Sequence, residues 1–521
     1  MKTYRSLFVC AAILLLLNIR CLAQNSLAAR VDEFINAEMS RQHIPGLALA
    51  VIRDGQLVLS KGYGLANVEH HVPVTPATVF QSGSIGKQFT ATAIMLLVED
   101  GKVSLDDRIS KYFPDLPETW QRITVRNLLT HTAGLGDFAP DFDLRRDYTE
   151  DEFLAAIKSI PLAHRTGEEW DYSNLGYVLS GILIRKLTGK FYGDFLRERV
   201  FNPLGMNTAR IISEADIVEN RAAGYRLEKG ELKNQEWVSP SVNTTADGSL
   251  YLTVLDMAKW EAALSDKRLL KRSSLDQMWT PAKLNDGRQK AYGFGWHTNV
   301  IHGPRVLFHG GGWQGFKSFI TRLPDERLTI VFFANLWQTN EHRLARGLLS
   351  IFHSEFALPA EQPRQDQEAK VTALVKKVLR QFSQGMVDFK LFTPAASAAM
   401  LPQRVGHISE SLNSLSLPAA VISSIELVSR REEGEFRAYR YLLIDISQTL
   451  ICTIKLTKDD KIADLQVQPD QVATNYVGKP TRFTSAVKRG SSRKGSNIGS
   501  TLSSTRIKSR PSTALLSQAN A

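Results

Sequence analysis

The chain of 521 residues is long enough for two or three domains, and a hydrophobic content of 43% suits a globular core. Its net charge of +11 comes from its ends, because residues 471–521 hold nine Lys and Arg without an acid and residues 1–23 hold three more. The stretch between them carries a net charge of −1. The main part of the chain is therefore not basic, and its charge gives no reason to expect binding to nucleic acids or membranes.

The first 23 residues have the pattern of a secretory signal peptide. Lys2 and Arg5 precede an apolar run over residues 7–17, and small residues at 21–23 provide a cleavage site. The run is too short to span a bilayer comfortably, and no later segment is long enough to do so. Two of the three cysteines lie in this segment, and its removal leaves Cys452 alone, so no intrachain disulfide is expected. The sequence therefore predicts an exported protein, periplasmic or secreted, with no transmembrane segment in the mature chain.

Residues 24–358 are predicted to form one domain, in which strands from both ends flank a mainly helical insertion. Asp54-Gly55 between two short apolar runs is a strong hairpin signal. In chain order we expect a helix at 27–39, strands at 47–52 and 57–60, mostly helices over 105–265, strands at 292–300, 305–309, 316–323 and 328–334, and a helix at 343–356. This order predicts one sheet built from both ends and covered by helices.

The remainder of the chain is predicted to contain a linker, a small domain and a tail. Residues 359–369 are polar and interrupted by proline, which is typical of a linker. Residues 370–478 predict a small α+β domain in which we find no nucleophile–base pair, metal cluster or phosphate loop, and its role stays open. Within it we expect a helix at 371–382 and strands at 420–428, 436–444 and 450–456. Residues 479–521 are basic and poor in large apolar residues, which predicts disorder.

The candidate catalytic group begins at Ser84-Ile85-Gly86-Lys87, where small residues give way to a proline-free run that ends at Gly101. If Ser84 opens a helix, the unpaired N–H groups there favour developing negative charge. Lys87 returns to the same helix face, and burial beside an apolar helix body would lower its pKa so that it can take a hydroxyl proton. This is the S-x-x-K arrangement of active-site serine enzymes, although Ser485–Lys488 and Ser491–Lys494 also match it.

Three further stretches corroborate this group. In Tyr172-Ser173-Asn174, the tyrosine can shuttle a proton and the asparagine amide can hold the lysine or a substrate carbonyl; the alternative is a buried tyrosine beside a turn. The glycines of His309-Gly310-Gly311-Gly312 end a predicted strand and let a ligand approach the backbone; the alternative is a glycine-rich bend. His131, in a loop, is interpreted as structural.

With these motifs in place, residues 27–357 resemble the serine β-lactamase and penicillin-binding-protein superfamily, in its class C β-lactamase-like branch. The order and spacing of six motifs carry the resemblance: Ser84-Ile85-Gly86-Lys87, residues 128–135, Tyr172-Ser173-Asn174, residues 203–206, residues 292–296 and His309-Gly310-Gly311. The resemblance implies an α/β (α+β) fold with a five-stranded antiparallel sheet flanked by helices. It also implies a helical subdomain, with the site between the two parts.

The resemblance also implies roles for individual residues, and it implies no metal or organic cofactor. In the family the oxyanion is held by two backbone N–H groups, one on the nucleophile and one on the strand after the third motif. The residues in these roles are Ser84 as acylated nucleophile, Lys87 as its base partner, Tyr172 as proton shuttle, Asn174 as ligand of lysine and substrate, Gly312 as the second oxyanion donor, and His309 and Gly311 as substrate-binding residues of the third motif.

The third motif departs from that of class C β-lactamases, which carry Lys-Thr-Gly or Lys-Ser-Gly. His309-Gly310-Gly311 resembles the esterase, D-aminopeptidase and amidase members instead, and neutral histidine attracts a carboxylate less than lysine does. We therefore expect an exported serine hydrolase that acts on small esters, D-amino-acid peptides or amides, or β-lactams. Its substrate is expected to be a small molecule or a peptide, and fragments of peptidoglycan are among the candidates. Oligomeric state stays open.

Two other classes of function are weighed against this one. The first is a catalytically idle peptidoglycan- or ligand-binding protein of the same fold, and the intact serine, lysine, tyrosine and asparagine argue against it. The second is nucleic-acid binding through the tail, which lacks the interleaved aromatic residues that stack bases.

Overall fold

The computed structural model describes residues 27–138, 142–301, 303–361, 363–400, 402–415 and 418–470, all within one compact unit. The predicted signal peptide and the predicted tail lie outside these residues. Among the helices of the described ranges, none has the length and apolarity needed to cross a bilayer. Cys452 is buried and not bonded to another cysteine.

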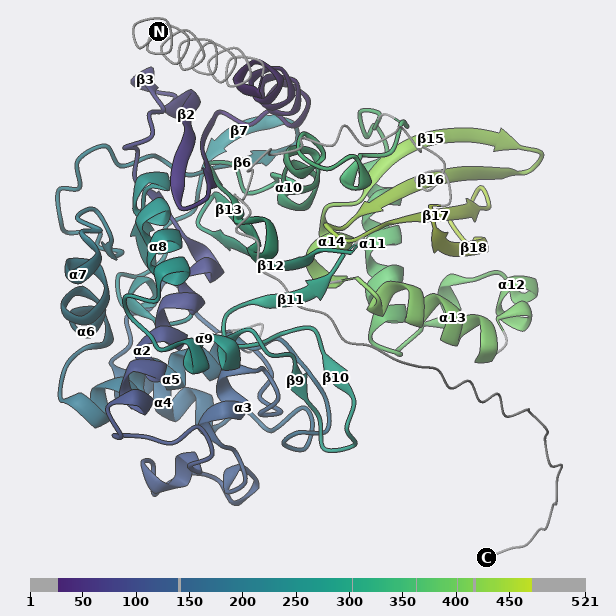
Figure 1. Ribbon diagram of the computed structural model, residues 1–521. Helices are drawn as coiled ribbons and strands as arrows, with labels where there is room; N and C mark the ends of the chain where they lie inside the picture. The colour runs from purple at the N-terminus through teal and green to yellow at the C-terminus, as the bar shows by residue number, and fades with distance from the viewer. Residues whose placement is uncertain are drawn as a thin grey trace, which may run out of the picture. The chain divides into compact units, whose positions relative to one another are not determined.

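A seven-stranded antiparallel sheet organises the described residues between 27 and 358 (Figure 1). Strand β1 from the N-terminal end pairs with β14 from the C-terminal end, with Leu49 opposite Phe332. This confirms the prediction of one sheet built from both ends. The resemblance implied five strands, and two short edge strands, β3 and β11, extend the five long ones. The strands in sheet order are β11 (His297–Val300), β12 (Arg305–Trp313), β13 (Phe316–Leu323), β14 (Leu328–Ala334), β1 (Gly46–Arg53), β2 (Gln56–Asn67) and β3 (Val72–Pro73).

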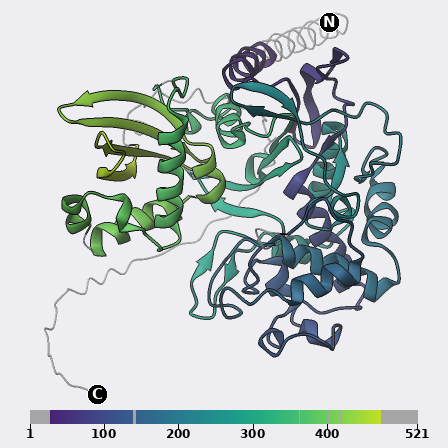
Figure 2. The ribbon, with the colours of Figure 1, turned by 180° about the vertical axis from the view of Figure 1, so that it is seen from behind.

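Both faces of this sheet are covered, which explains why the sequence of β1 is an unbroken apolar run. Leu47, Leu49 and Val51 belong to one hydrophobic cluster, whereas Ala48 and Ala50 belong to another on the opposite face. The first face is covered by a helix over residues 27–42 and by α10 (Glu341–Ser350), and the second by α8 (Val254–Asp266) (Figure 2).

The helices between β4 and β11 form the second half of this region. Helix α2 is buried along nearly its whole length, and α5 packs against it. The elements are β4 (Phe80–Gln81), α2 (Lys87–Glu99), α3 (Val125–Leu129), α4 (Glu150–Lys158), α5 (Asn174–Thr188), α6 (Tyr192–Leu196), α7 (Asn202–Leu204), β5 (Arg210–Ile211), β6 (Tyr225–Glu228), β7 (Glu231–Asn234), β8 (Leu250–Leu252), α8, α9 (Arg272–Met278), β9 (Ala282–Lys283) and β10 (Gln289–Lys290). Strands β4, β8 and β5 pair in a small sheet that supports the loop entering α2.

Residues 369–470 have a hydrophobic core of their own. A four-stranded antiparallel sheet packs against helices there, in the α+β arrangement that the sequence predicts. Its elements are α11 (Ala369–Ser383), α12 (Pro394–Ala399), α13 (Pro402–Asn413), α14 (Pro418–Ser423), β15 (Glu426–Glu433), β16 (Phe436–Ile444), β17 (Thr449–Leu456) and β18 (Ile462–Pro469).

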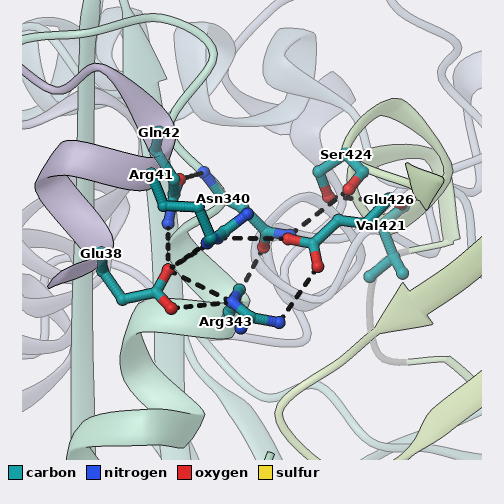
Figure 3. A network of polar contacts seen from close by, with 8 residues as sticks. All are labelled: Glu38, Arg41, Gln42, Asn340, Arg343, Val421, Ser424 and Glu426. Carbon is teal, nitrogen blue, oxygen red and sulfur yellow. Dashed lines mark hydrogen bonds and ion pairs between the residues drawn. The ribbon is translucent and has the colours of Figure 1, made fainter. Parts of the chain in front are cut away.

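A buried ionic network joins this second core to the first region (Figure 3). Arg343 of α10 donates through Nε to Glu38 and through Nη1 to Glu426, each at 3.0 Å. Asn340 donates to Glu426 at 3.0 Å, and Arg41 lies 2.6 Å from Glu38. Burial alone would raise the pKa of Glu38, but the hydrogen bond from Arg41 and the charge of Arg343 hold it below its usual value. Burial raises the pKa of Glu426 despite the charge of Arg343.

Several element boundaries differ from the sequence prediction. Residues 292–296 are not a strand, because Gly293 and Gly295 pass so close to Met278 and Gln88 that the chain bends there. The helix expected at 343–356 ends at Ser350 and is followed by a short 3₁₀ turn at Ser354–Phe356. Strand β12 continues through its three glycines to Trp313 instead of ending at residue 309, and the strand predicted at 420–428 begins only at Glu426, after α14.

Candidate active site

Ser84 lies in a 3₁₀ turn, Gly83–Gly86, immediately before α2, so the α-helix begins at Lys87 and not at Ser84 as the sequence predicted. The turn is held tightly by its surroundings. Gly83 has a φ of +51°, and a Cβ added there would lie 2.4 Å from the backbone N of Gly312. A Cβ at Gly86 would lie 2.8 Å from the Cα of Gly248. Glycine at both positions lets two other segments reach the serine.

Lys87 is fully buried and uses three hydrogen bonds. Its Nζ lies 3.1 Å from Ser84 Oγ, 2.7 Å from Asn174 Oδ1 and 2.6 Å from the backbone carbonyl of Asp247. An ammonium has three protons, so these acceptors use its full capacity. All three acceptors are uncharged, so the amine forms no ion pair with a carboxylate among the described residues.

Asn174 and Tyr172 flank the amine at the start of α5. Asn174 accepts from Lys87 and donates through Nδ2 to Asp137 at 2.9 Å, which fixes the orientation of its amide. The Lys87 Nζ lies 5.0 Å from the centre of the half-buried Tyr172 ring. The structure therefore brings together Ser84, Lys87, Tyr172 and Asn174 as the sequence predicted.

His131 lies behind Tyr172, with ring centres 4.3 Å apart. Its Nδ1 accepts from the backbone N–H of Ser173 at 3.1 Å, which places the residue before Asn174. Burial, together with the nearby charge of Lys87, lowers its pKa well below the usual value. A neutral, buried ring in this place supports Tyr172 from behind and agrees with the structural interpretation.

His309 is only 1% exposed and does not line the pocket at Ser84. Its Nδ1 lies 2.6 Å from the carbonyl of Gly310, and its Nε2 lies 3.0 Å from the Tyr292 hydroxyl. Burial lowers its pKa to about 3; the Gly310 bond opposes this shift and the charge of Lys87 adds to it. The imidazole is therefore neutral near pH 7, and it lies behind the site instead of facing a substrate.

The glycines after His309 bring β12 against the serine turn. A Cβ at Gly311 would lie 2.2 Å from the carbonyl of Ser82 and 3.0 Å from the backbone N of Ser84. Gly311 is buried, whereas Gly312 lines the pocket together with Ser84. The backbone N–H groups of Ser84 and Gly312, the pair implied as an oxyanion hole, thus belong to two segments in direct contact.

The pocket at Ser84 has a volume of about 110 Å³. Its walls hold aromatic and aliphatic side chains and one carboxylate, but no lysine or arginine. The lining residues are Gly83, Ser84, Phe138, Leu144, Phe153, Asn174, Val242, Thr245, Asp247, Gly248, Ser249, Gly312 and Trp313.

Sequence reasoning missed Asp137, Asp247 and Trp313. The pKa of Asp137 is raised, first because the surrounding protein screens its carboxyl from water and also because the Asp247 carboxylate is near, against hydrogen bonds from Phe138 and Asn174. The Oδ1 of Asp247 is buried without a hydrogen-bond partner among the described residues. Asp137 and Asp247 thus add two acids to the surroundings of Ser84 and Lys87, and the residues described as lining the pocket include no lysine or arginine. No local motif marks these residues, because their partners lie far away in sequence.

Comparison with known proteins agrees with this geometry. A family described as Beta-lactamase matches residues 31–351. Penicillin-binding protein 4* of Bacillus subtilis is 28% identical over 61% of this chain and 74% of its own length, and a D-aminopeptidase of Gluconobacter oxydans is 28% identical over 66% and 65%. The solved D-amino acid amidase of Ochrobactrum anthropi aligns with a TM-score of 0.56 and 28% identity, over 64% of this chain and 100% of its own.

A penicillin-binding protein homologue from Pyrococcus abyssi, solved as an octamer, has a TM-score of 0.58 at 22% identity. The alignment covers 85% of this chain and 98% of that one, and the likeness is one of fold.

Proposed function

Since this chain belongs to the beta-lactamase family and is a serine hydrolase, we propose that it is exported and hydrolyses small esters or D-amino-acid amides through an acyl-enzyme on Ser84. The observation that carries the proposal is the 3.1 Å contact between Lys87 Nζ and Ser84 Oγ inside a pocket that also holds Asn174.

The reaction follows from the positions of these groups. Lys87 takes the proton of the Ser84 hydroxyl while Oγ bonds to the substrate carbonyl carbon. The carbonyl oxygen becomes an oxyanion, which the N–H groups of Ser84 and Gly312 stabilise. The C–O or C–N bond to the leaving group then breaks, and Tyr172 relays to that group the proton that Lys87 took from Ser84. Water attacks the resulting ester, releases the acid and returns the proton to Ser84.

Substrates without a carboxylate are favoured by the charges around the pocket. No lysine or arginine lines it, Asp247 does, and the neutral His309 stands where class C enzymes carry a lysine. A carboxylate on a cephalosporin would therefore meet no cation that could offset its loss of water. The free ammonium of a D-amino-acid amide would instead meet the acids Asp137 and Asp247, and the similarity to a D-aminopeptidase and to a D-amino acid amidase supports this choice.

The proposal also includes export and a division into domains. Residues 1–23 would be removed as a signal peptide, residues 24–358 would form the hydrolase domain, and 370–478 would form the small α+β domain, after a linker at 359–369. Separate hydrophobic cores support this division. N-terminal sequencing of the protein recovered from a periplasmic fraction tests the export step, and a retained residue 1 there would contradict it.

Activity assays test the reaction and its substrate together. The purified protein should hydrolyse p-nitrophenyl butyrate and D-alanine p-nitroanilide with a higher kcat/KM than a chromogenic cephalosporin. Ser84→Ala should abolish all turnover and all labelling by a fluorophosphonate, whereas Ser485→Ala, which alters another S-x-x-K match, should change neither. Full activity in Ser84→Ala would contradict the nucleophile, and a preference for the cephalosporin would contradict the substrate class.

A further inference from the structure

A second cavity, of about 350 Å³, adjoins the active pocket and is not used by the proposed reaction. We name it the amide pocket after the five carboxamide side chains that line it: Asn67, Gln81, Asn234, Gln235 and Gln314. They come from strands β2, β4 and β7, from the loop after β7 and from the turn after β12. Trp237 stands at its rim with 54% of its surface exposed.

The two cavities share a wall. Trp313 lines the active pocket and packs in one hydrophobic cluster with Tyr251, which lines the amide pocket. The Trp313 indole donates to Asn243 Oδ1 at 2.6 Å, and the Asn243 amide donates to Glu214, another lining residue of the amide pocket, at 3.2 Å. Residues of the two cavity walls are therefore in direct contact with one another.

Three of the amides in this cavity have buried oxygens without partners. The Oε1 atoms of Gln81, Gln235 and Gln314 have no hydrogen-bond partner within the described ranges, and Gln81 as a whole is only 6% exposed. Buried polar groups in native proteins are nearly always paired, so three such atoms in one cavity call for a ligand that supplies several hydrogen bonds.

The charged groups around these amides are already occupied. Glu236 pairs with Arg145 at 3.3 Å and with Arg226 at 3.5 Å, and Glu214 accepts from Asn243. The Arg221 side chain bonds to the Tyr251 hydroxyl, where it opposes the rise that burial causes in the pKa of Tyr251. Beside these partly exposed charged groups, the cavity offers a ligand neutral amides and an indole face, which do not select an ion.

From these observations we propose that the amide pocket binds one unit of a neutral oligosaccharide. A sugar hydroxyl both donates and accepts, so it can pair with a carboxamide in either orientation. The flat, partly exposed indole of Trp237 offers an apolar surface for the C–H face of a pyranose ring, with its polar edge left in water. Such pockets typically combine an apolar wall with a few convergent polar groups.

Binding is measured on the full mature chain carrying Ser84→Ala, so that the result does not depend on the proposed reaction. The probes are N,N′-diacetylchitobiose and cellobiose, which distinguish an N-acetylated from a plain saccharide, titrated by calorimetry at millimolar concentration. We expect one or both to bind, and Trp237→Ala and Gln235→Leu each to weaken binding about tenfold or more. Phe389→Ala, which removes a similarly exposed aromatic residue from another part of the chain, should leave the affinity unchanged.

Three results would overturn the proposal: no binding of either disaccharide, equal affinity in both pocket variants and their parent, or binding of an alanine tripeptide amide in place of the sugars. In the chain with Ser84 intact, Trp237→Ala should hydrolyse p-nitrophenyl butyrate at the parent rate. Saccharide binding by a chain without esterase activity would still support the amide pocket, so the two proposals can fail separately.

Discussion

Two buried cations, Lys87 and Arg343, are held in opposite ways. Lys87 contacts only uncharged acceptors, namely a hydroxyl, an amide oxygen and a backbone carbonyl. Arg343 lies between the carboxylates of Glu38 and Glu426. The difference matches the role proposed for Lys87 at the serine, whereas the two ion pairs of Arg343 join two parts of the chain.

The largest effect is expected from removing the first cation. Lys87→Ala should lower kcat/KM for p-nitrophenyl butyrate about 10³-fold, since Ser84 then has no group to take its proton. The fold should survive, because the lost hydrogen bonds free no buried charge. Steady-state kinetics measure the effect. Lys111→Ala, at an exposed ion pair, is the matched control and should keep full activity. A tenfold or smaller loss in Lys87→Ala would show that another base serves Ser84.

Removing the second cation should change stability and not chemistry. Arg343→Ala leaves Glu38 and Glu426 buried without their shared partner, which should cost about 3–5 kcal/mol in the free energy of unfolding. Denaturant unfolding measures this cost, with Arg272→Ala at an exposed pair expected to change it by about 0–1 kcal/mol. The kcat/KM per folded molecule should stay at the parent value. An activity loss without a stability loss would mean that the network acts on the site.

Tyr172→Phe sharpens the first half of the comparison, because it removes only the hydroxyl of a ring whose centre lies 5.0 Å from the Lys87 amine and leaves that ring against His131. We expect kcat/KM to fall about 10²-fold, as is typical when a positioned proton donor is lost. The thermal midpoint should hardly move, since the contact between the two tilted rings at 4.3 Å remains. Rates near the parent value would make Tyr172 a packing residue.

The last effect, spread over several pH units, concerns His309, a group that burial keeps neutral. Its pKa is about 3 in the folded chain and near about 6.5 when exposed, so the unfolded chain binds more protons between these values. Its contribution to stability is therefore present above about pH 6.5 and is lost as the pH falls towards 3, at up to about 1.4 kcal/mol per pH unit. Unfolding of His309→Gln across this range should show a shallower slope than the parent.

Exposed His70 provides the control for that series, and His70→Gln should keep the parent slope. His131 and His297, whose pKa values burial also lowers well below the usual value, should account for a remaining slope in His309→Gln. If the free energy of unfolding of His309→Gln had the same pH slope as that of the parent, burial would not lower the pKa of His309.

The sequence predicted what depends on short spacing and left out what depends on distant contacts. Ser84 and Lys87 are three residues apart, and the apolar residues of β1 follow one another directly. The serine–lysine pair and the strand could therefore both be predicted from the local sequence pattern. The carbonyl of Asp247 reaches Lys87 across 160 residues, and no local signal marks it. His309 was expected to face a substrate, but the motif does not say which face of β12 its side chain takes. The bond to Tyr292 shows that it points into the protein.

The pairing of β1 with β14 has a consequence for how the chain is made. Leu49 lies opposite Phe332, 283 residues later, so β1 has no partner on that side until nearly the whole region has left the ribosome. Such high contact order slows folding and keeps the nascent polypeptide open. A chain interrupted before residue 328 would retain β1 and β2 with one bare, apolar strand edge, the kind of edge that recruits other strands into aggregates.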